Sequence, residues 1–426
     1  MKNRVVVTGL GVCAPNGVGL GTFRESLVQA KSGITHYEDL QKLKFSCQVA
    51  GKPNINTVNL NEYFSKVQLR GLDSSGLIYG VLAGVDAWKD AQLVKSNDTN
   101  PDWDSGIVFG TGILGVDKFR DSIYKLDKGD VRRLGSTSVI QTMASGISAY
   151  LGGILGLGNQ VTTNSSACTT GTEAILMGFE RIQSGKAKRM LVGSCSDSGP
   201  YVWGGFDAMR ILPRKFNETP DKASRPMSAT AAGFVPGSGA GALVLESLES
   251  ALARGVKIYA EVLGGAINSG GQRAGGSMTA PNNAAVQRCI QEAIANAGID
   301  AEAIDAINGH LTATTKDTTE IENWCQALNR RGDEFPYVNS FKSHFGHCLA
   351  AAGSIESVAA VLQLEQHQLF ANLNCEDVHP DILKLVSNDK IPRETLNFPA
   401  KIIAKASFGF GDVNACLILS KYQDSL

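Results

Sequence analysis

Cys168 is the residue best placed in this sequence for nucleophilic chemistry. It lies in the run 162–174, where small and polar residues lead into an apolar stretch, and this pattern predicts a helix that begins at Cys168. Unpaired N–H groups at a helix start stabilise a thiolate and lower the pKa of a cysteine from about 8.5, unless apolar surroundings seal the site. Because free cysteines are also among the most often buried residues, the run by itself fits a nucleophile or a buried structural thiol equally well.

Two further segments carry histidines in suitable places. The run 305–317 predicts a short apolar strand that leads to His310 and then to hydroxyl side chains, and the run 338–353 predicts a strand followed by a Gly-His step into an Ala-rich helix. Lys342 and His347 come as a pair in the second run. A histidine at a strand end is most often structural. However, two of only six histidines lie at such Gly-flanked ends, where α/β folds place their chemistry, which favours a Cys-His-His site.

The elements that must position these residues form two comparable halves. Strand-turn units at 5–11 and 258–265 open the halves 1–255 and 256–426, and each half later reaches a strand followed by a small-residue helix. If the halves pair about a pseudo-twofold axis, these two helices become central neighbours and bring Cys168 to His347. Apolar spacing near 3.6 predicts packed crossover helices at 283–297 and 353–366. The proline-containing segment 370–398 reads as loop and short strands.

The chain resembles a β-ketoacyl-[acyl carrier protein] synthase of the type II elongating class, a thiolase-fold condensing enzyme. The resemblance covers nearly the whole length and rests on five motifs in order: SACTTG at 166–171, the His310 run, NSFKSHFGHCLAAAG at 339–353, the stretch from ASRP at 223–226 to 233–241, and SFGFG at 407–411. It implies an α/β, thiolase-like duplicated αβαβα layered fold. It also implies decarboxylative Claisen condensation of a Cys-bound acyl group with malonyl-[acyl carrier protein], in fatty-acid or specialised polyene or polyketide biosynthesis.

The resemblance also implies a role for each matching residue. Cys168 is the expected nucleophile, His310 and His347 the decarboxylation pair, and Lys342 their electrostatic support. The backbone N–H groups of Cys168 and Phe410 are expected to form an oxyanion hole, and Phe410 to act as a gate. The expected substrate-binding residues are Thr312, Thr314, Ile113, Phe408 and Leu311. Of these, Thr312 and Thr314 would hold the pantetheine arm, whereas Ile113 either limits acyl length or is simply a buried aliphatic residue. Neither a metal nor a free cofactor is required.

The sequence departs from the family pattern at three notable positions. Leu311 and Ala313 occupy positions that are small, usually Gly, in relatives, and Asp412 replaces a Gly after the gate. We expect Leu311 either to line the pocket and alter substrate choice or to pack into a redirected loop. Asp412 either stiffens the gate loop or adopts the positive φ that Asp sometimes tolerates. These departures suggest a divergent branch that serves a polyene or another specialised acyl chain.

Partners and compartment are suggested more weakly. Among 426 residues the net charge is −1, which argues against nucleic acid, and no apolar run is long enough to span a membrane. Nine scattered cysteines without a CxxC pair indicate reduced thiols in a cytoplasm. An acidic acyl carrier protein is the expected partner, and a homodimer is favoured over a heterodimer with a related subunit. The basic side chains that would dock the carrier, or merely be solvated, are Lys66, Arg70, Arg210, Arg214 and Lys215.

Other condensing-type functions fit less well. A thiolase needs a second catalytic cysteine near the C-terminus, but Cys416 lies in a predicted strand. A class III condensing enzyme uses Cys, His and Asn, and Lys342 beside His347 argues against it. A non-catalytic chain-length subunit normally lacks the nucleophile. Because the His310 loop is altered, such a binding-only or impaired partner of a ketosynthase stays the alternative.

Overall fold

The computed structural model describes residues 2–96, 99–271 and 278–423. One mixed sheet of 11 strands runs through the molecule. Its first half contains, in spatial order, β1 (Val5–Ala14), β8 (Gly239–Ser247), β7 (Arg189–Ser196), β5 (Ser105–Thr111) and β6 (Val161–Thr162). Its second half contains β9 (Ala260–Ser269), β15 (Val413–Ser420), β14 (Ile402–Gly409), β10 (Ala306–Asn308) and β11 (Tyr337–Asn339).

The two halves of the sheet repeat one strand order. Numbered in chain order within each half, the first strand pairs antiparallel with the fifth, and the fifth pairs antiparallel with the fourth. The remaining two pairs in each half are parallel. The halves meet where Val5–Val7 of β1 pair antiparallel with residues 260–262 of β9. Shorter strands are β2 (Gly17–Val18) on β1, and the pairs β3 (Ile34–His36) with β4 (Val49–Gly51) and β12 (Gln368–Leu369) with β13 (Leu396–Asn397).

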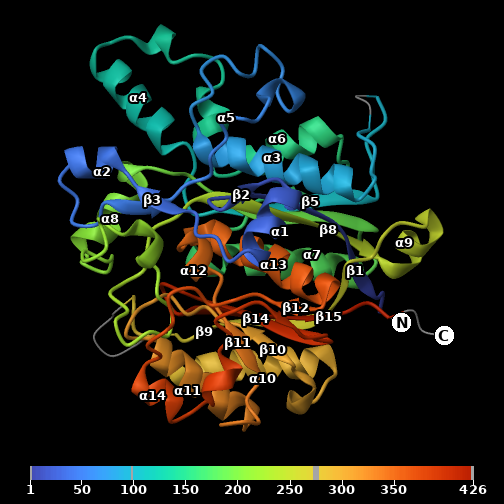
Figure 1. The fold of residues 1–426 in the computed structure, drawn as a ribbon. Coiled ribbons are helices and arrows are strands. Elements are labelled where there is room, and N and C mark those ends of the chain that lie inside the picture. The colour runs from blue at the N-terminus through green and yellow to red at the C-terminus, as the bar shows by residue number, and fades with distance from the viewer. Residues whose placement is uncertain (1, 97–98, 272–277, 424–426) are drawn as a thin grey trace.

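The helices complete five layers, which Figure 1 shows edge-on. One outer layer contains α3 (Ser75–Asp90) and α6 (Gly146–Leu155), the middle layer α7 (Thr170–Gln183) and α13 (Ala352–Gln366), and the other outer layer α10 (Asn283–Ala297) and α11 (Asp317–Leu328). The predicted αβαβα fold is therefore confirmed. The remaining helices are α1 (Leu20–Val28), α2 (Glu38–Lys42), α4 (Val116–Asp127), α5 (Ser138–Thr142), α8 (Pro200–Ala208), α9 (Leu248–Arg254), α12 (Lys342–Phe345) and α14 (Pro380–Leu383).

Two glycines in β1 explain one difference from the sequence interpretation. We predicted a turn near Gly9 and Gly11, but the strand continues to Ala14. A Cβ at Gly9 would lie 2.2 Å from the carbonyl oxygen of Ala87, and one at Gly11 would lie 1.9 Å from that of Ala83. Here glycine lets the backbone of α3 pack directly on the strand. The segment 370–398 also contains the short helix α14, where we expected only loop and strands.

The central helices α7 and α13 pack against each other as predicted. A Cβ at Gly171 would lie 2.3 Å from the backbone nitrogen of Ser354, and one at Gly353 would lie 2.6 Å from that of Thr172. The two helix starts therefore cross at glycines, with no side chain between them. This close crossing fixes the distance between the segments that precede the two helices, and those segments carry Cys168 and His347. No helix of the described residues is long and apolar enough to cross a membrane.

Candidate active site

Cys168 lies one short turn before helix α7. It sits in the 3₁₀ turn η3 (Ala167–Thr169), and α7 proper begins at Thr170. Ala167 has φ 50°, a left-handed conformation that non-glycine residues seldom adopt. The partly buried thiol lines a cavity of about 520 Å³. The predicted helix start at Cys168 is thus correct to within two residues.

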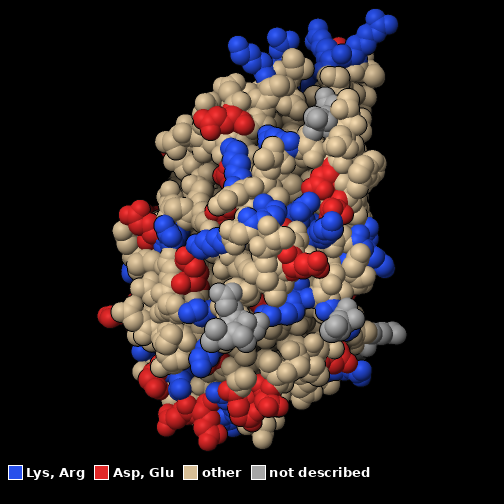
Figure 2. All heavy atoms as spheres, turned by 90° about the vertical axis from the view of Figure 1, so that its right-hand side faces the viewer, with Lys and Arg blue, Asp and Glu red and all other residues tan. Residues whose placement is uncertain are grey.

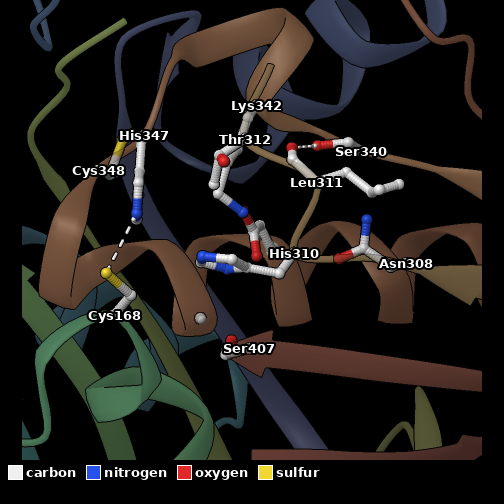
Figure 3. Close-up of polar contacts among 12 residues, drawn as sticks. Cys168, Asn308, His310, Leu311, Thr312, Ser340, Lys342, His347, Cys348 and Ser407 are labelled. Carbon is white, nitrogen blue, oxygen red and sulfur yellow. Dashed lines mark hydrogen bonds and ion pairs between the residues drawn. The ribbon is translucent and has the colours of Figure 1, made fainter. Parts of the chain in front are cut away.

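His347 faces the thiol directly (Figure 3). Its Nε2 lies 3.2 Å from Cys168 Sγ, and its Nδ1 accepts a hydrogen bond of 3.2 Å from the backbone N–H of Leu349. Because Nδ1 is an acceptor, the neutral ring carries its proton on Nε2 and donates toward the sulfur. His347 is 3% exposed, and the ring of Phe234 packs edge-on against it. The fold therefore fixes both the orientation and the tautomer of this imidazole.

His310 lies beside His347, on the loop that follows β10. The ring centroids are 5.3 Å apart in an edge-to-face arrangement. The carboxylate of Glu320 accepts the backbone N–H groups of His310 and Leu311 at 2.6 and 2.7 Å, and Asp317 accepts those of Thr312, Ala313 and Thr314. Two buried carboxylates at the start of α11 thus hold the whole loop. Burial raises the pKa of Asp317 to about 6 and that of Glu320 to about 7.

Lys342 is buried behind the histidines and does not line the cavity. Its Nζ lies 2.5 Å from Oε1 of Glu356, and the other carboxylate oxygen of Glu356 lies 2.7 Å from Nζ of Lys405. The sequence interpretation named Lys342 but missed Glu356 and Lys405. A glutamate inside an Ala-rich helix and a lysine inside an apolar strand were the signals that could have revealed them, since such residues are rarely buried without a partner.

Burial determines the protonation states at the centre. It raises the pKa of the Cys168 thiol above its ordinary value, although hydrogen bonds from the Phe410 backbone and the charge of Lys342 oppose this. Burial and the charge of Lys342 hold the pKa values of His310 and His347 well below the usual range. A helix start lowers a thiol pKa only where apolar surroundings do not seal the site, and here burial of the thiol is the larger effect. The resting site is therefore a neutral thiol with two neutral imidazoles.

The structure brings most of the predicted substrate-binding residues to the same cavity. Its lining includes Ile113, Thr312, Thr314, Phe408 and Phe410. The rings of Phe408 and His310 lie 6.3 Å apart, and the hydroxyls of Thr312 and Thr314 lie 3.1 Å apart. Ile113 is 53% exposed, so it is not the buried aliphatic residue that was the alternative interpretation.

Leu311 does not line the cavity, which corrects one expectation. Its side chain is fully buried in the apolar cluster around Ile307, Ile321 and Trp324 and points away from Cys168 in Figure 3. The main chain turns sharply here, with φ 20° at Leu311 and φ 62° at Ala313, so the loop keeps a path that glycine would adopt more easily. Of the two outcomes that we considered, packing into the loop is the one observed.

Asp412 takes the positive φ that we considered for it, 61°. Its side chain accepts the backbone N–H of Asn282, the residue that caps α10, at 3.1 Å. The carboxylate thus ties the loop carrying Phe410 to the start of α10. Asp412 also lines the cavity.

The five basic residues proposed for carrier docking are all exposed, and none forms an ion pair within the part of the chain that the structure describes. Arg210, Arg214 and Lys215 follow α8 and flank Ile211, which lines the cavity, whereas Lys66 and Arg70 precede α3. Lys316, at the cavity wall, is a further exposed basic residue that we did not predict. On the face drawn in Figure 2, Lys and Arg stand out at the top edge and Asp and Glu gather at the bottom.

The arrangement suits carbanion and acyl-transfer chemistry. A thiol, two N–H donors and backbone N–H groups converge at one end of a largely apolar cavity, where hydrogen bonds to a developing negative charge are strong. The ligand atoms of Cys168, His310 and His347 also lie within 4.8 Å of one another, close enough to hold a metal ion. However, Nε2 of His347 carries the proton in the hydrogen-bonded arrangement, so this ring is not set up as a ligand.

Comparisons with known proteins agree with this site. Residues 2–251 match the beta-ketoacyl synthase N-terminal domain, and residues 259–376 match the beta-ketoacyl synthase C-terminal domain. The chain is 33% identical to 3-oxoacyl-[acyl-carrier-protein] synthase 2 of Synechocystis, over 99% of both chains.

Two solved structures are also similar. One is a ketosynthase of a type II polyketide synthase in complex with its acyl-carrier protein (TM-score 0.85, 27% identity, 99% of this chain and 100% of that one). The other is the ishigamide ketosynthase/chain length factor (TM-score 0.86, 28% identity, 99% and 100%). The chain therefore belongs to the beta-ketoacyl synthase family of condensing enzymes.

Proposed function

We propose that this chain condenses an acyl group held on Cys168 with a malonyl group on an acyl carrier protein, releasing CO₂ and forming a β-ketoacyl carrier. The observation that carries the proposal is the 3.2 Å contact between Cys168 Sγ and His347 Nε2 beside His310, at the wall of an apolar cavity. This contact argues against a binding-only chain-length partner, because such a subunit has no use for an ordered thiol and imidazole pair.

Acyl transfer is the first step. The sulfur of Cys168 forms a bond to the acyl carbonyl carbon, the bond from that carbon to the carrier sulfur breaks, and the thiol proton ends on the departing carrier thiol. The N–H of His347 stabilises the sulfur as it becomes anionic. Backbone N–H groups of Cys168 and Phe410 reach the same sulfur and lie where they can stabilise an adjacent oxyanion. Each such donor typically lowers the barrier by about 3 to 4 kcal/mol.

Decarboxylation and condensation follow at the histidines. The bond between the malonyl carboxylate and its methylene carbon breaks, and the electron pair moves onto the thioester oxygen as an enolate. His310 and His347 donate their N–H groups to that oxygen. The methylene carbon then attacks the Cys168 thioester, and the sulfur of Cys168 leaves as the β-ketoacyl product forms. Thr312 and Thr314 line the cavity where the pantetheine arm would enter.

The experiment follows each half-reaction by mass spectrometry. Incubation with an acyl carrier should add the acyl mass to the wild-type protein, and malonyl carrier should then yield CO₂ and β-ketoacyl carrier. Cys168→Ala should take up no acyl group while keeping its melting temperature, because a partly buried thiol-to-methyl change costs little packing. Cys325→Ala, which removes a buried thiol elsewhere, is the matched control. Acylation of Cys168→Ala would show that the nucleophile is misassigned.

The same proposal includes a partner subunit. Exposed apolar side chains gather on α4 and beyond it, and they include Phe119 (58% exposed), Tyr124 (52%), Val131 (58%) and Val139 (71%). Ile113 lines the cavity yet is also exposed, so a second copy covering this surface would close the cavity. A homodimer is expected by light scattering, and Phe119→Glu should shift it to monomer. A wild-type monomer would favour a heterodimer with a related subunit.

The proposed carrier dock and compartment rest on charge and thiol chemistry. The relative solved with its acyl-carrier protein supports a carrier as partner, and exposed Arg210, Arg214 and Lys215 could steer an acidic one. Reversing these three charges should raise the KM for the carrier-bound substrate while leaving transfer from a small acyl thioester unchanged.

All nine cysteines are free thiols, which supports a reducing cytoplasm.

A further inference from the structure

Lys405 is a buried lysine in a strand that otherwise contains mostly apolar and small residues. It lies in β14, which ends at Phe408 and Gly409 beside the site, and its side chain is 0% exposed. Its Nζ lies 2.7 Å from Oε2 of Glu356, 2.5 Å from the carbonyl oxygen of Ala406 and 3.0 Å from Oγ of Ser407. An ion pair with a carboxylate and hydrogen bonds to a carbonyl and a hydroxyl suit the three donors of an ammonium group. The geometry therefore fits a charged lysine, although burial lowers its pKa.

Glu356 lies between two lysines. Its carboxylate oxygens contact Nζ of Lys342 at 2.5 Å and Nζ of Lys405 at 2.7 Å, and all three side chains are at most 1% exposed. A single Lys-Glu pair would be neutral, whereas two ammonium groups and one carboxylate leave one net positive charge. Charges buried in this way are screened very little by solvent.

The net charge is close to the reacting groups. The positive charges of Lys342 and Lys405 both hold the pKa values of His310 and His347 down. Two other ionisable groups also face this region. Glu320 of α11, which accepts the backbone N–H of His310, raises the pKa of Lys405 by its negative charge. Burial raises the pKa of Cys416 in β15 and keeps that thiol neutral. Ser407 links Lys405 to α7, since its Oγ lies 2.8 Å from Oγ1 of Thr172.

We propose that Lys405 is a positioning residue for the decarboxylation step, whose ammonium group supplies the net positive charge that keeps both histidines neutral N–H donors and favours the enolate. This inference rests on the proposed function. Neutrality matters at His347 because Nδ1 accepts the N–H of Leu349. A protonated ring would turn a second N–H toward that donor, so the hydrogen bond would be lost and the ring displaced.

The test compares half-reactions in Lys405→Met, which keeps the side-chain length and removes the charge. We expect the rate of malonyl carrier decarboxylation to fall about tenfold while acylation of Cys168 changes by less than about threefold. The reason is that the charge of Lys405 acts on both histidines that hold the enolate, whereas backbone N–H groups also stabilise the anion formed in acyl transfer. Because loss of a neighbouring positive charge raises a histidine pKa, the acid limb of the decarboxylation profile should move up by about one pH unit.

A second variant separates charge from packing. In Lys405→Met/Glu356→Gln the remaining charge of Lys342 restores the net charge of +1, so the acid limb should return toward its wild-type position. Lys118→Met, which removes a buried lysine paired with Asp73 outside the cavity lining, controls for a general loss of stability. An unchanged acid limb in Lys405→Met, with both half-reactions reduced alike, would make Lys405 a structural ion-pair partner and overturn the inference. A wild-type protein without decarboxylation would instead refute the proposed function.

Discussion

Replacing Leu311 by glycine tests how the His310 loop is built. The side chain is fully buried in the apolar cluster under α11, and its carbonyl oxygen accepts the hydroxyl of Ser340 at 2.8 Å. The backbone, however, has φ 20°, a conformation that favours glycine. The substitution therefore removes packing and relieves backbone strain at the same residue, and these two effects have opposite signs.

The balance can be worked out from these features. Truncating a buried leucine costs about 2 to 5 kcal/mol, and the freer unfolded backbone of glycine costs about 0.5 to 1 kcal/mol more. Relief of the left-handed strain returns about 1 to 2 kcal/mol. With the middle of each range, the net loss is about 3 kcal/mol. An unfolding entropy of about 2.1 cal/mol/K per residue, summed over 426 residues, is about 0.9 kcal/mol/K, so Tm should fall by roughly 2 to 4 °C.

The assay measures Tm and the kcat/KM of several acyl carriers in the same preparations. Because Leu311 lies outside the cavity lining, all substrates should fall together and their ranking should stay the same. Leu311→Ala loses nearly the same packing but keeps the strain, so Leu311→Gly should be at least as stable. Ala313→Gly, at φ 62°, should be close to neutral. A changed substrate ranking with an unchanged Tm would refute this reasoning and make Leu311 a specificity residue.

Three other changes have equally definite outcomes. His310→Ala and His347→Ala should each keep acylation of Cys168 but lose CO₂ release, as mass spectrometry and decarboxylation assays can show; wild-type decarboxylation in either would exclude the paired-donor site. Since burial raises the pKa of Cys168, its alkylation by iodoacetamide should keep accelerating above about pH 8.5, and a plateau below pH 7 would contradict a neutral thiol. Asp412→Gly should lower the free energy of unfolding by about 1 kcal/mol in thermal melts, because the lost hydrogen bond to Asn282 outweighs the small backbone strain relieved at an aspartate. A more stable variant would show that the strain is the larger effect.

The local sequence was enough to predict helix bounds and the segments that meet at the site. The α10 helix begins at Asn283 and ends at Ala297 as its apolar periodicity predicts. One face of that helix packs on the sheet, so its apolar residues recur with the helical period. The duplicated halves and the meeting of Cys168 with His347 also followed, since both helix starts are rich in small residues. Glycine was harder to interpret: Gly9 and Gly11 resemble a turn in the sequence, but a neighbouring helix requires them inside a strand.

The tertiary structure alone decided the properties that depend on surroundings. The thiol pKa of Cys168 rises because the fold buries it, which a helix-start motif does not encode. Leu311 points into the core rather than the cavity because its backbone turns through a positive φ, which the residue type does not suggest. Glu356 and Lys405, which are 49 residues apart in the sequence, become an ion pair only when α13 packs against β14. Local sequence sets the period and ends of helices and strands, whereas burial, charge balance and side-chain direction arise from contacts between distant segments.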